Sequence, residues 1–159
     1  MTKSQVLKLV LSVILPVGIG GIAGLFTAEA VPGWYATLNQ PSFNPPNWIF
    51  GPVWTTLYLL MGISLFLVWK ENYSRERNIA IVVFLIQLAL NFAWSLIFFH
   101  FKMIGLALLE IVVLWISILS MLFIFYKIKP FAAYINIPYL LWVAFATMLN
   151  ASYYILNRI

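Results

Sequence analysis

Cysteine is missing from this 159-residue sequence, and charged side chains make up only 8% of it. The lack of cysteine excludes disulfides, cysteine-ligated zinc and thiol catalysis. A soluble domain carries about 25% charged residues to cover its surface, whereas 64% of this chain is hydrophobic. Such a chain needs lipid as its solvent. We therefore expect a single membrane domain over residues 1–159, without a separate soluble module.

Acidic side chains are also scarce. The four carboxylates are Glu29, Glu71, Glu76 and Glu110. The sequence shows no carboxylate pair, Ser–His–Asp set, metal-ligand cluster or phosphate-binding glycine loop. These absences argue against hydrolases, kinases and metalloenzymes. We expect no conventional enzyme, no required cofactor and no metal site.

What the chain does contain is five apolar runs of about 20 residues or more, the length that crosses a bilayer as a helix. The predicted spans are residues 6–26, 46–69, 78–99, 103–126 and 130–156. The first run is longer than the apolar core of a signal peptide, so we expect a true span there. Short connections after the first force neighbouring helices to be adjacent and antiparallel. The fold predicted is an all-α bundle of five transmembrane helices.

Basic residues divide unevenly between the two ends of such a bundle. One end carries Lys3, Lys8, Lys70, Arg75, Arg77, Lys127 and Lys129, and the other carries Lys102 and Arg158. The positive-inside rule then places the N-terminus in the cytoplasm, with the first loop and the C-terminus outside. Because topology accounts for the charge, we expect no nucleic-acid partner. Helical bundles ordinarily reside in inner membranes, so a bacterial inner membrane is the expected location.

The first connection differs from the others in length and composition. Residues 33–54 gather aromatic rings, prolines and amides without any charge, although apolar runs flank them. A solvated loop would carry Lys, Glu and Ser instead. Flat rings on a stiff backbone are suited to covering an apolar, planar ligand. We therefore predict a structured first loop that acts as a lid.

Polar and aromatic side chains recur at helical spacing within three of the runs. The stripes are Gln87, Asn91 and Ser95 beside Trp94; Trp142, Ala146, Asn150 and Tyr153; and Trp54 with Tyr58. Polar groups in hydrocarbon must turn inward and find partners. Each amide taken alone is explained by an interhelical hydrogen bond, worth about 0.6–2 kcal/mol. Indole rings from three helices favour a cavity for an apolar ligand instead.

Three segments carry a family pattern. They are Trp34-Tyr35…Pro41-Ser42-Phe43…Pro45-Pro46…Trp48…Trp54…Leu57-Tyr58…Met61-Gly62, then Asn91-Phe92-Ala93-Trp94-Ser95, and finally Pro138-Tyr139…Trp142…Ala144-Phe145-Ala146-Thr147…Leu149-Asn150. Together they resemble the bacterial members of the translocator protein family, also called the tryptophan-rich sensory protein or peripheral-type benzodiazepine receptor family. The chain length and the number of spans agree with this resemblance.

The resemblance implies a five-helix bundle that binds porphyrins, haem, sterols and benzodiazepine-site ligands beneath its first loop, usually as a homodimer. The implied contacts are Trp54 and Asn91 with polar groups of the ligand, Tyr35 and Pro45 in the lid, and Trp142 and Ala146 in the wall. Trp94, Ser95 and Asn150 complete the predicted pocket.

Three functions stay open at this point. The first is a membrane sensor or carrier for tetrapyrroles. The second is light-dependent breakdown of protoporphyrin, reported for some bacterial members, in which Trp142 and Trp54 would be the reacting residues. The third is proton-coupled transport through Glu110, an ionisable group within a span. The residues favour the first function.

Small residues spaced by four mark places where helices approach closely. Gly20…Gly24 is expected to pack within the protomer. Ala89 and Ala93 fit either internal packing or a homodimer seam, and the family's dimer contact on this helix favours the seam.

Two further signals are weak. Leu149…Tyr153…Arg158 fits a proposed cholesterol pattern, which is of low specificity, and we do not expect specific sterol binding. His100 is the only histidine, and we do not expect it to ligate haem.

Overall fold

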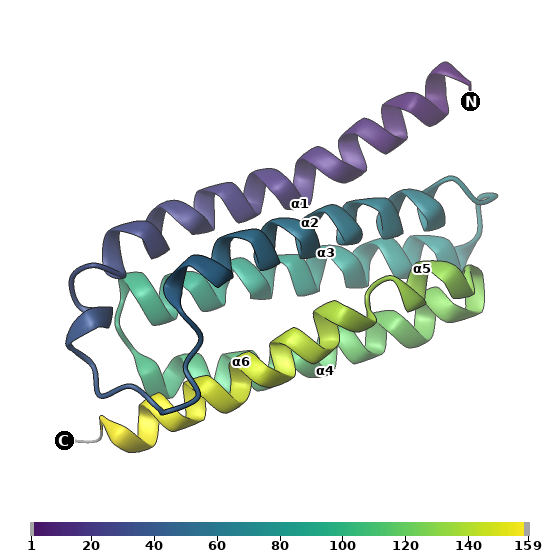
Figure 1. Cartoon of the computed structure of the whole chain (residues 1–159). Coiled ribbons are helices and arrows are strands. Elements are labelled where there is room, and N and C mark those ends of the chain that lie inside the picture. Colours follow the sequence, from purple (N-terminus) through teal and green to yellow (C-terminus); the bar gives the residue numbers. More distant parts are fainter. Residues whose placement is uncertain (1, 158–159) are drawn as a thin grey trace.

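The computed structural model describes residues 2–157 and shows one helical bundle (Figure 1). Its elements are α1 (Lys3–Ala30), the 3-10 turn η1 (Tyr35–Thr37), α2 (Asn47–Trp69), α3 (Arg75–Ser95), the π-helical turn η2 (Leu96–His100), α4 (Ile104–Ile128), α5 (Pro130–Tyr134) and α6 (Ile137–Leu156). Five helical segments are long and apolar enough to cross a membrane, with α3 continuing into η2 and α5 into α6. The predicted all-α bundle of five spans is therefore confirmed.

The two ends of the bundle differ in charge. The beginning of α1, the α2–α3 connection and the α4–α5 connection lie together at one end, and the first loop lies at the other (Figure 1). At the basic end, Lys8 Nζ donates to the Trp69 carbonyl at 3.2 Å, and Lys129 Nζ lies 3.5 Å from a Glu71 carboxylate oxygen. We call these the basic end and the loop end.

Helices α1 and α2 touch backbone to backbone near the middle of α1. A Cβ built on Gly62 would lie 2.7 Å from Val13 Cα and 2.9 Å from the Ser12 carbonyl oxygen, so only glycine fits at this crossing. Pro16 has no N–H to give to the Ser12 carbonyl one turn earlier in α1. This carbonyl therefore faces α2 without its intrahelical partner.

The fifth span, expected as one run over residues 130–156, is divided into α5 and α6. Pro138 cannot donate to the Tyr134 carbonyl, and its ring disfavours helical backbone just before it. The side chain of Asn136 occupies the break, where its Nδ2 donates to Ser64 Oγ and to the Ala132 carbonyl. These bonds hold the break against α2.

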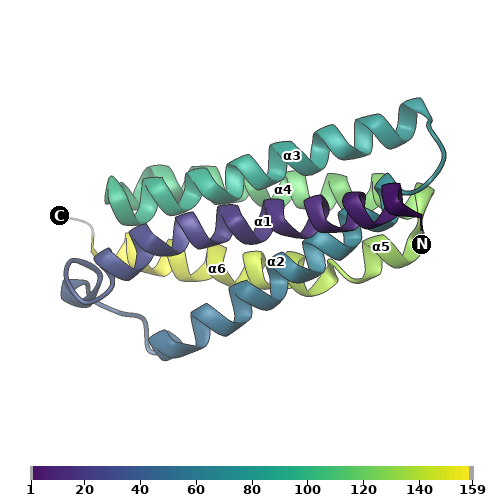
Figure 2. The same cartoon turned by 90° about the horizontal axis from the view of Figure 1, so that it is seen from above.

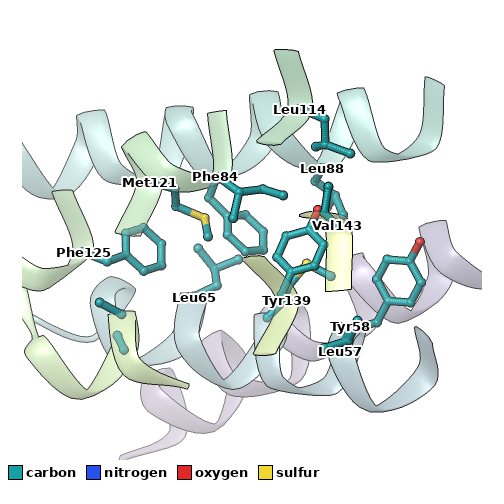
Figure 3. Close-up of a cluster of buried hydrophobic side chains, with 14 of the residues drawn as sticks. Leu57, Tyr58, Leu65, Phe84, Leu88, Leu114, Met121, Phe125, Tyr139 and Val143 are labelled. Atoms are coloured by element: carbon teal, nitrogen blue, oxygen red, sulfur yellow. The ribbon is translucent and has the colours of Figure 1, made fainter. Parts of the chain in front are cut away.

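The close-packed core lies mainly in the half of the bundle nearer the basic end. Figure 3 shows part of this cluster of buried side chains. It holds buried side chains from α2, α3, α4, α5 and the first half of α6. Phe84 of α3 and Phe125 of α4 stack there with ring centroids 6.3 Å apart. The half nearer the loop end is built differently, because a hollow lies between its helices.

Candidate functional site

A cavity of about 590 Å³ occupies the loop-end half of the bundle. This volume lies within the range of small-molecule sites, about 300–1,000 Å³. Its walls come from α1, α2, α3, η2 and α6, with the start of the first loop. The wall residues with aromatic or polar side chains are Thr27, Tyr35, Asn47, Phe50, Trp54, Thr55, Tyr58, Trp94, Ser95, Phe98, Phe99, Trp142, Asn150 and Tyr153.

Aromatic pairs from different helices form parts of this wall. Trp54 and Tyr58 of α2 are stacked, with centroids 5.6 Å apart. Trp94 of α3 stacks on Phe98 of η2 at 5.3 Å. Trp142 of α6 meets Phe50 edge to face at 6.0 Å. Rings fixed by their neighbours in this way offer rigid apolar surface to a flat ligand.

The π-helical turn explains why two consecutive phenylalanines reach the cavity. The Phe101 N–H donates to the Leu96 carbonyl at 2.9 Å, five residues back, which widens the turn. Phe98 and Phe99 both line the cavity. Such turns occur frequently at functional sites. The sequence did not indicate this turn, because no residue type requires it.

Helix α1 contributes small residues to the wall, at Gly20, Gly21, Ala23, Gly24 and Ala28. The close approach expected for Gly20…Gly24 is found only at Gly20, where a Cβ would lie 2.2 Å from the Tyr58 ring. A Cβ on Gly21 or Gly24 would meet nothing within 4 Å. Gly21 and Gly24 therefore enlarge the cavity and make no close helix–helix contact. The four-residue spacing in the sequence did not distinguish these two roles.

Asn91 lies beneath the cavity rather than on its wall. The Tyr58 hydroxyl donates to Asn91 Oδ1 at 2.6 Å, and Asn91 Nδ2 donates to the Tyr139 hydroxyl at 3.1 Å. Tyr139 in turn donates to Gln87 Oε1 at 2.9 Å. The network joins α2, α3 and α6, and through Tyr58 it fixes one side of the cavity.

Asn150 does line the cavity, but its amide is also occupied. Its Oδ1 accepts from Trp94 Nε1 at 3.1 Å, and its Nδ2 donates to the Ile104 carbonyl at 3.0 Å. Among the described residues, the indole N–H groups of Trp54 and Trp142 and the Ser95 hydroxyl have no hydrogen-bond partner. The Trp142 N–H is buried, so the donors left for a ligand on this largely apolar wall are those of Trp54 and Ser95.

Side chains fasten the first loop to the end of α6. The Tyr35 hydroxyl accepts from Tyr153 of α6 at 2.7 Å and donates to Asn44 Oδ1 at 3.2 Å. The Asn39 N–H donates to Asn157 Oδ1 at 2.9 Å, and Asn157 Nδ2 donates back to the Asn39 carbonyl at 3.0 Å. Burial raises the pKa of the Tyr35 hydroxyl. This effect is larger than the lowering of the pKa by the hydrogen bonds with Tyr153 and Asn44.

The structure brings most of the expected ligand-contact residues to one place. Those on the cavity wall are Tyr35, Trp54, Trp94, Ser95, Trp142, Ala146 and Asn150. Pro45 and Asn91 are not part of the wall. The sequence did not single out Phe50, Thr27 or Phe99 as wall residues.

Other residues named from the sequence lie elsewhere. Ala89 is exposed and Ala93 half-buried on α3. Both Glu110 carboxylate oxygens are buried without a partner among the described residues, and Glu110 is not on the cavity wall. His100 is exposed and packs edge to face on Phe26 at 5.4 Å.

The cholesterol pattern does not form a lipid-facing surface over its described members. Leu149 and Tyr153 are buried and line the cavity. Arg158 lies outside the described residues.

Comparison with known proteins identifies the family of this chain. The model of the TspO/MBR family matches residues 12–156. The chain belongs to this family. It is 40% identical over 154 residues to the tryptophan-rich protein TspO of Archaeoglobus fulgidus, covering 96% of this chain and 99% of that relative. The TspO/MBR family resemblance predicted from the tryptophan, proline and amide motifs is therefore confirmed.

Two relatives connect the chain to the other names of the family. The human translocator protein is 41% identical over 119 residues, covering 74% of this chain and 70% of its own. The tryptophan-rich sensory protein of Cereibacter sphaeroides is 35% identical over 117 residues, covering 74% and 72%. This chain is a multi-pass membrane protein of the TspO/MBR family.

Proposed function

We propose that this protein binds tetrapyrroles, protoporphyrin or haem, in the cavity beneath the first loop, and acts as a membrane sensor or carrier for them. The observation that carries the proposal is the stacked aromatic wall around a hollow of about 590 Å³. A flat macrocycle gains most from rigid rings on opposite sides. The first loop serves as the lid.

The few free donors on the wall suit the acidic side chains of such a ligand. The Trp54 N–H and the Ser95 hydroxyl line the cavity and can donate to a carboxylate. His100 is not on the wall, so binding does not depend on an axial histidine. Metal-free protoporphyrin and haem should therefore bind with similar affinity.

The setting of the site in the membrane is part of the proposal. The charge difference between the two ends supports a cytoplasmic N-terminus in an inner membrane. The outward position of Ala89 and the half-buried Ala93 supports a homodimer in which α3 meets its copy, because small residues let backbones approach.

Light-dependent breakdown of protoporphyrin is the second candidate. Trp142 and Trp54 both line the cavity, so a bound porphyrin excited by light would touch two oxidisable indoles, and oxygen would be the co-reactant. Transport coupled to Glu110 is a further alternative. It has less support, because the carboxylate is not on the wall.

The test is a titration of the purified protein with protoporphyrin, in darkness and in light, followed by quenching of tryptophan fluorescence. We expect saturable quenching in the dark that is weakened by Trp142→Phe. The matched control is Trp48→Phe, because Trp48 is 75% exposed and does not line the cavity. Equal affinity of the two variants would contradict the proposed site. A coloured product formed only in light, and lost in Trp142→Phe, would favour the second candidate.

A further inference from the structure

The seam between α1 and α2 is closed along its middle. At Gly62 a Cβ would run into the backbone of Ser12 and Val13, and at Gly20 it would run into the Tyr58 ring. These positions mark close contact between the two antiparallel helices. One side of the cavity is formed just beyond them, toward the loop end.

The seam between α1 and α2 is open from the helical turn after Gly20 to the loop end. Gly24 and Ala28 continue the α1 side, and Gly51 and Thr55 continue the α2 side. A Cβ on Gly24 or Gly51 would meet nothing within 4 Å, so no neighbouring atom fills the space beside these two positions. Figure 2 shows the beginning of α2 displaced to one side of the end of α1. The two helices therefore diverge toward the loop end.

Exposure of the wall residues shows where the cavity opens. On the inner side, Ser95, Phe98 and Asn150 are buried. The four residues at the edges of the open seam, Gly24, Ala28, Gly51 and Thr55, are all exposed and all line the cavity. We call these four residues the side window.

The side window lies before the last residue of α1, within the part of the helix expected to cross the membrane. Gly24 is six residues from the last residue of α1, Ala30, which corresponds to about 9 Å along the helix axis. Exposed Ile22 and Leu25 flank it on α1. The window therefore opens within the last turns of the membrane-spanning helix, beside apolar side chains that suit contact with lipid.

We propose that ligands enter and leave the cavity through the side window, directly from the bilayer, while the first loop stays closed. This inference rests on the proposed function. Among the described residues no hydrogen bond crosses the window, because the Thr55 hydroxyl bonds back to the Gly51 carbonyl of its own helix. The loop, by contrast, is held by the Asn39–Asn157 and Tyr35–Tyr153 pairs. The ligand class is accordingly flat, amphipathic molecules that dissolve in the membrane. Water-soluble analogues of the same size are excluded.

The absence of cysteine allows each route to be locked separately. In Gly24→Cys/Thr55→Cys, a flexible thiol-specific cross-linker closes the side window. In Asn39→Cys/Asn157→Cys, the same reagent closes the loop. The control for each double-cysteine variant is the same protein before the cross-linker is added. Both are reconstituted in liposomes that contain protoporphyrin, and binding in the dark is followed by tryptophan quenching after rapid mixing.

We expect the window lock to slow association about tenfold or more, because binding then requires a rearrangement, and to retain ligand that was loaded beforehand. The loop lock should leave both rates unchanged. Gly24→Leu should slow association without a cross-linker, and Gly18→Leu should not, since Gly18 has equal free space but does not line the cavity.

Unchanged rates in the window lock, or slowed rates in the loop lock alone, would overturn the side-window route and leave the binding site intact. Absence of quenching in the wild-type protein would overturn the proposed function itself. A sulfonated, membrane-excluded porphyrin that binds as fast as protoporphyrin would also contradict entry from the bilayer.

Discussion

The hydroxyl of Tyr153, near the end of α6, donates a 2.7 Å hydrogen bond to the hydroxyl of Tyr35 in the first loop. The two rings also pack with centroids 5.2 Å apart. Tyr35 is 5% exposed and Tyr153 is 2% exposed. The first loop is thus fastened by buried side chains to the last helix, and this contact forms the loop end of the cavity wall.

Tyr153→Phe tests this fastening. The variant keeps the ring and removes the donor, so the loop should lose about 1 kcal/mol of docking free energy. We expect faster proteolysis within residues 36–46 and an otherwise unchanged bundle. Tyr73→Phe at the basic end, where Tyr73 is 79% exposed, is the control. Equal cleavage rates in the two variants would contradict a fastening role.

The docked loop should also respond to alkaline pH. Burial raises the pKa of Tyr35 above its usual value of 10.0, so the folded state holds this proton more tightly than the unfolded state. The stabilisation is complete below about pH 10 and is lost as the pH rises through the folded-state pKa. We expect loop cleavage to accelerate in that range. In Tyr35→Phe this alkaline step should vanish, and its persistence would rule out Tyr35 as the cause.

The contact between Gly20 and Tyr58 predicts that alanine substitutions at the neighbouring Gly20 and Gly21 have different effects on stability. A Cβ at Gly20 meets the Tyr58 ring, which is buried and fixed by Asn91. Gly20→Ala should therefore cost about 1–3 kcal/mol of stability through overpacking. Gly21→Ala adds a methyl group where nothing lies within 4 Å, and should be close to neutral. Thermal unfolding in detergent distinguishes the two, and equal melting temperatures would refute the crossing geometry.

Asn91 is expected to act through Tyr58 rather than on the ligand. Asn91→Ala leaves the buried Tyr58 hydroxyl without its acceptor, while Tyr139 keeps its bond to Gln87. The loss should cost about 1–3 kcal/mol. We expect a lower melting temperature together with weaker porphyrin binding. Weaker binding at an unchanged melting temperature would instead indicate direct contact, as the family resemblance implied.

Helical spacing was sufficient to predict which faces turn inward. Gln87, Asn91 and Ser95 are four residues apart and all buried. Spacing could not tell which of them reach a hollow, because that depends on the angle between helices. The Gly62 crossing and the divergence of α2 open space beside Ser95 and leave Asn91 beneath it.

Two other structural features were not predicted from the sequence, for different reasons. The Pro138 break was foreseeable in principle from the proline, yet apolar residues on both sides gave the appearance of one run. The π-helical turn at Leu96–His100 contains no residue type that requires it, so local residue preferences did not indicate it.

The pairs Asn39–Asn157 and Tyr35–Tyr153 each join residues 118 positions apart. Synthesis runs from the N-terminus, so the partners of the loop emerge only after the four preceding spans have been made. Until α6 has inserted, Trp142 is also missing. A growing chain therefore has no finished cavity before α6 is in place.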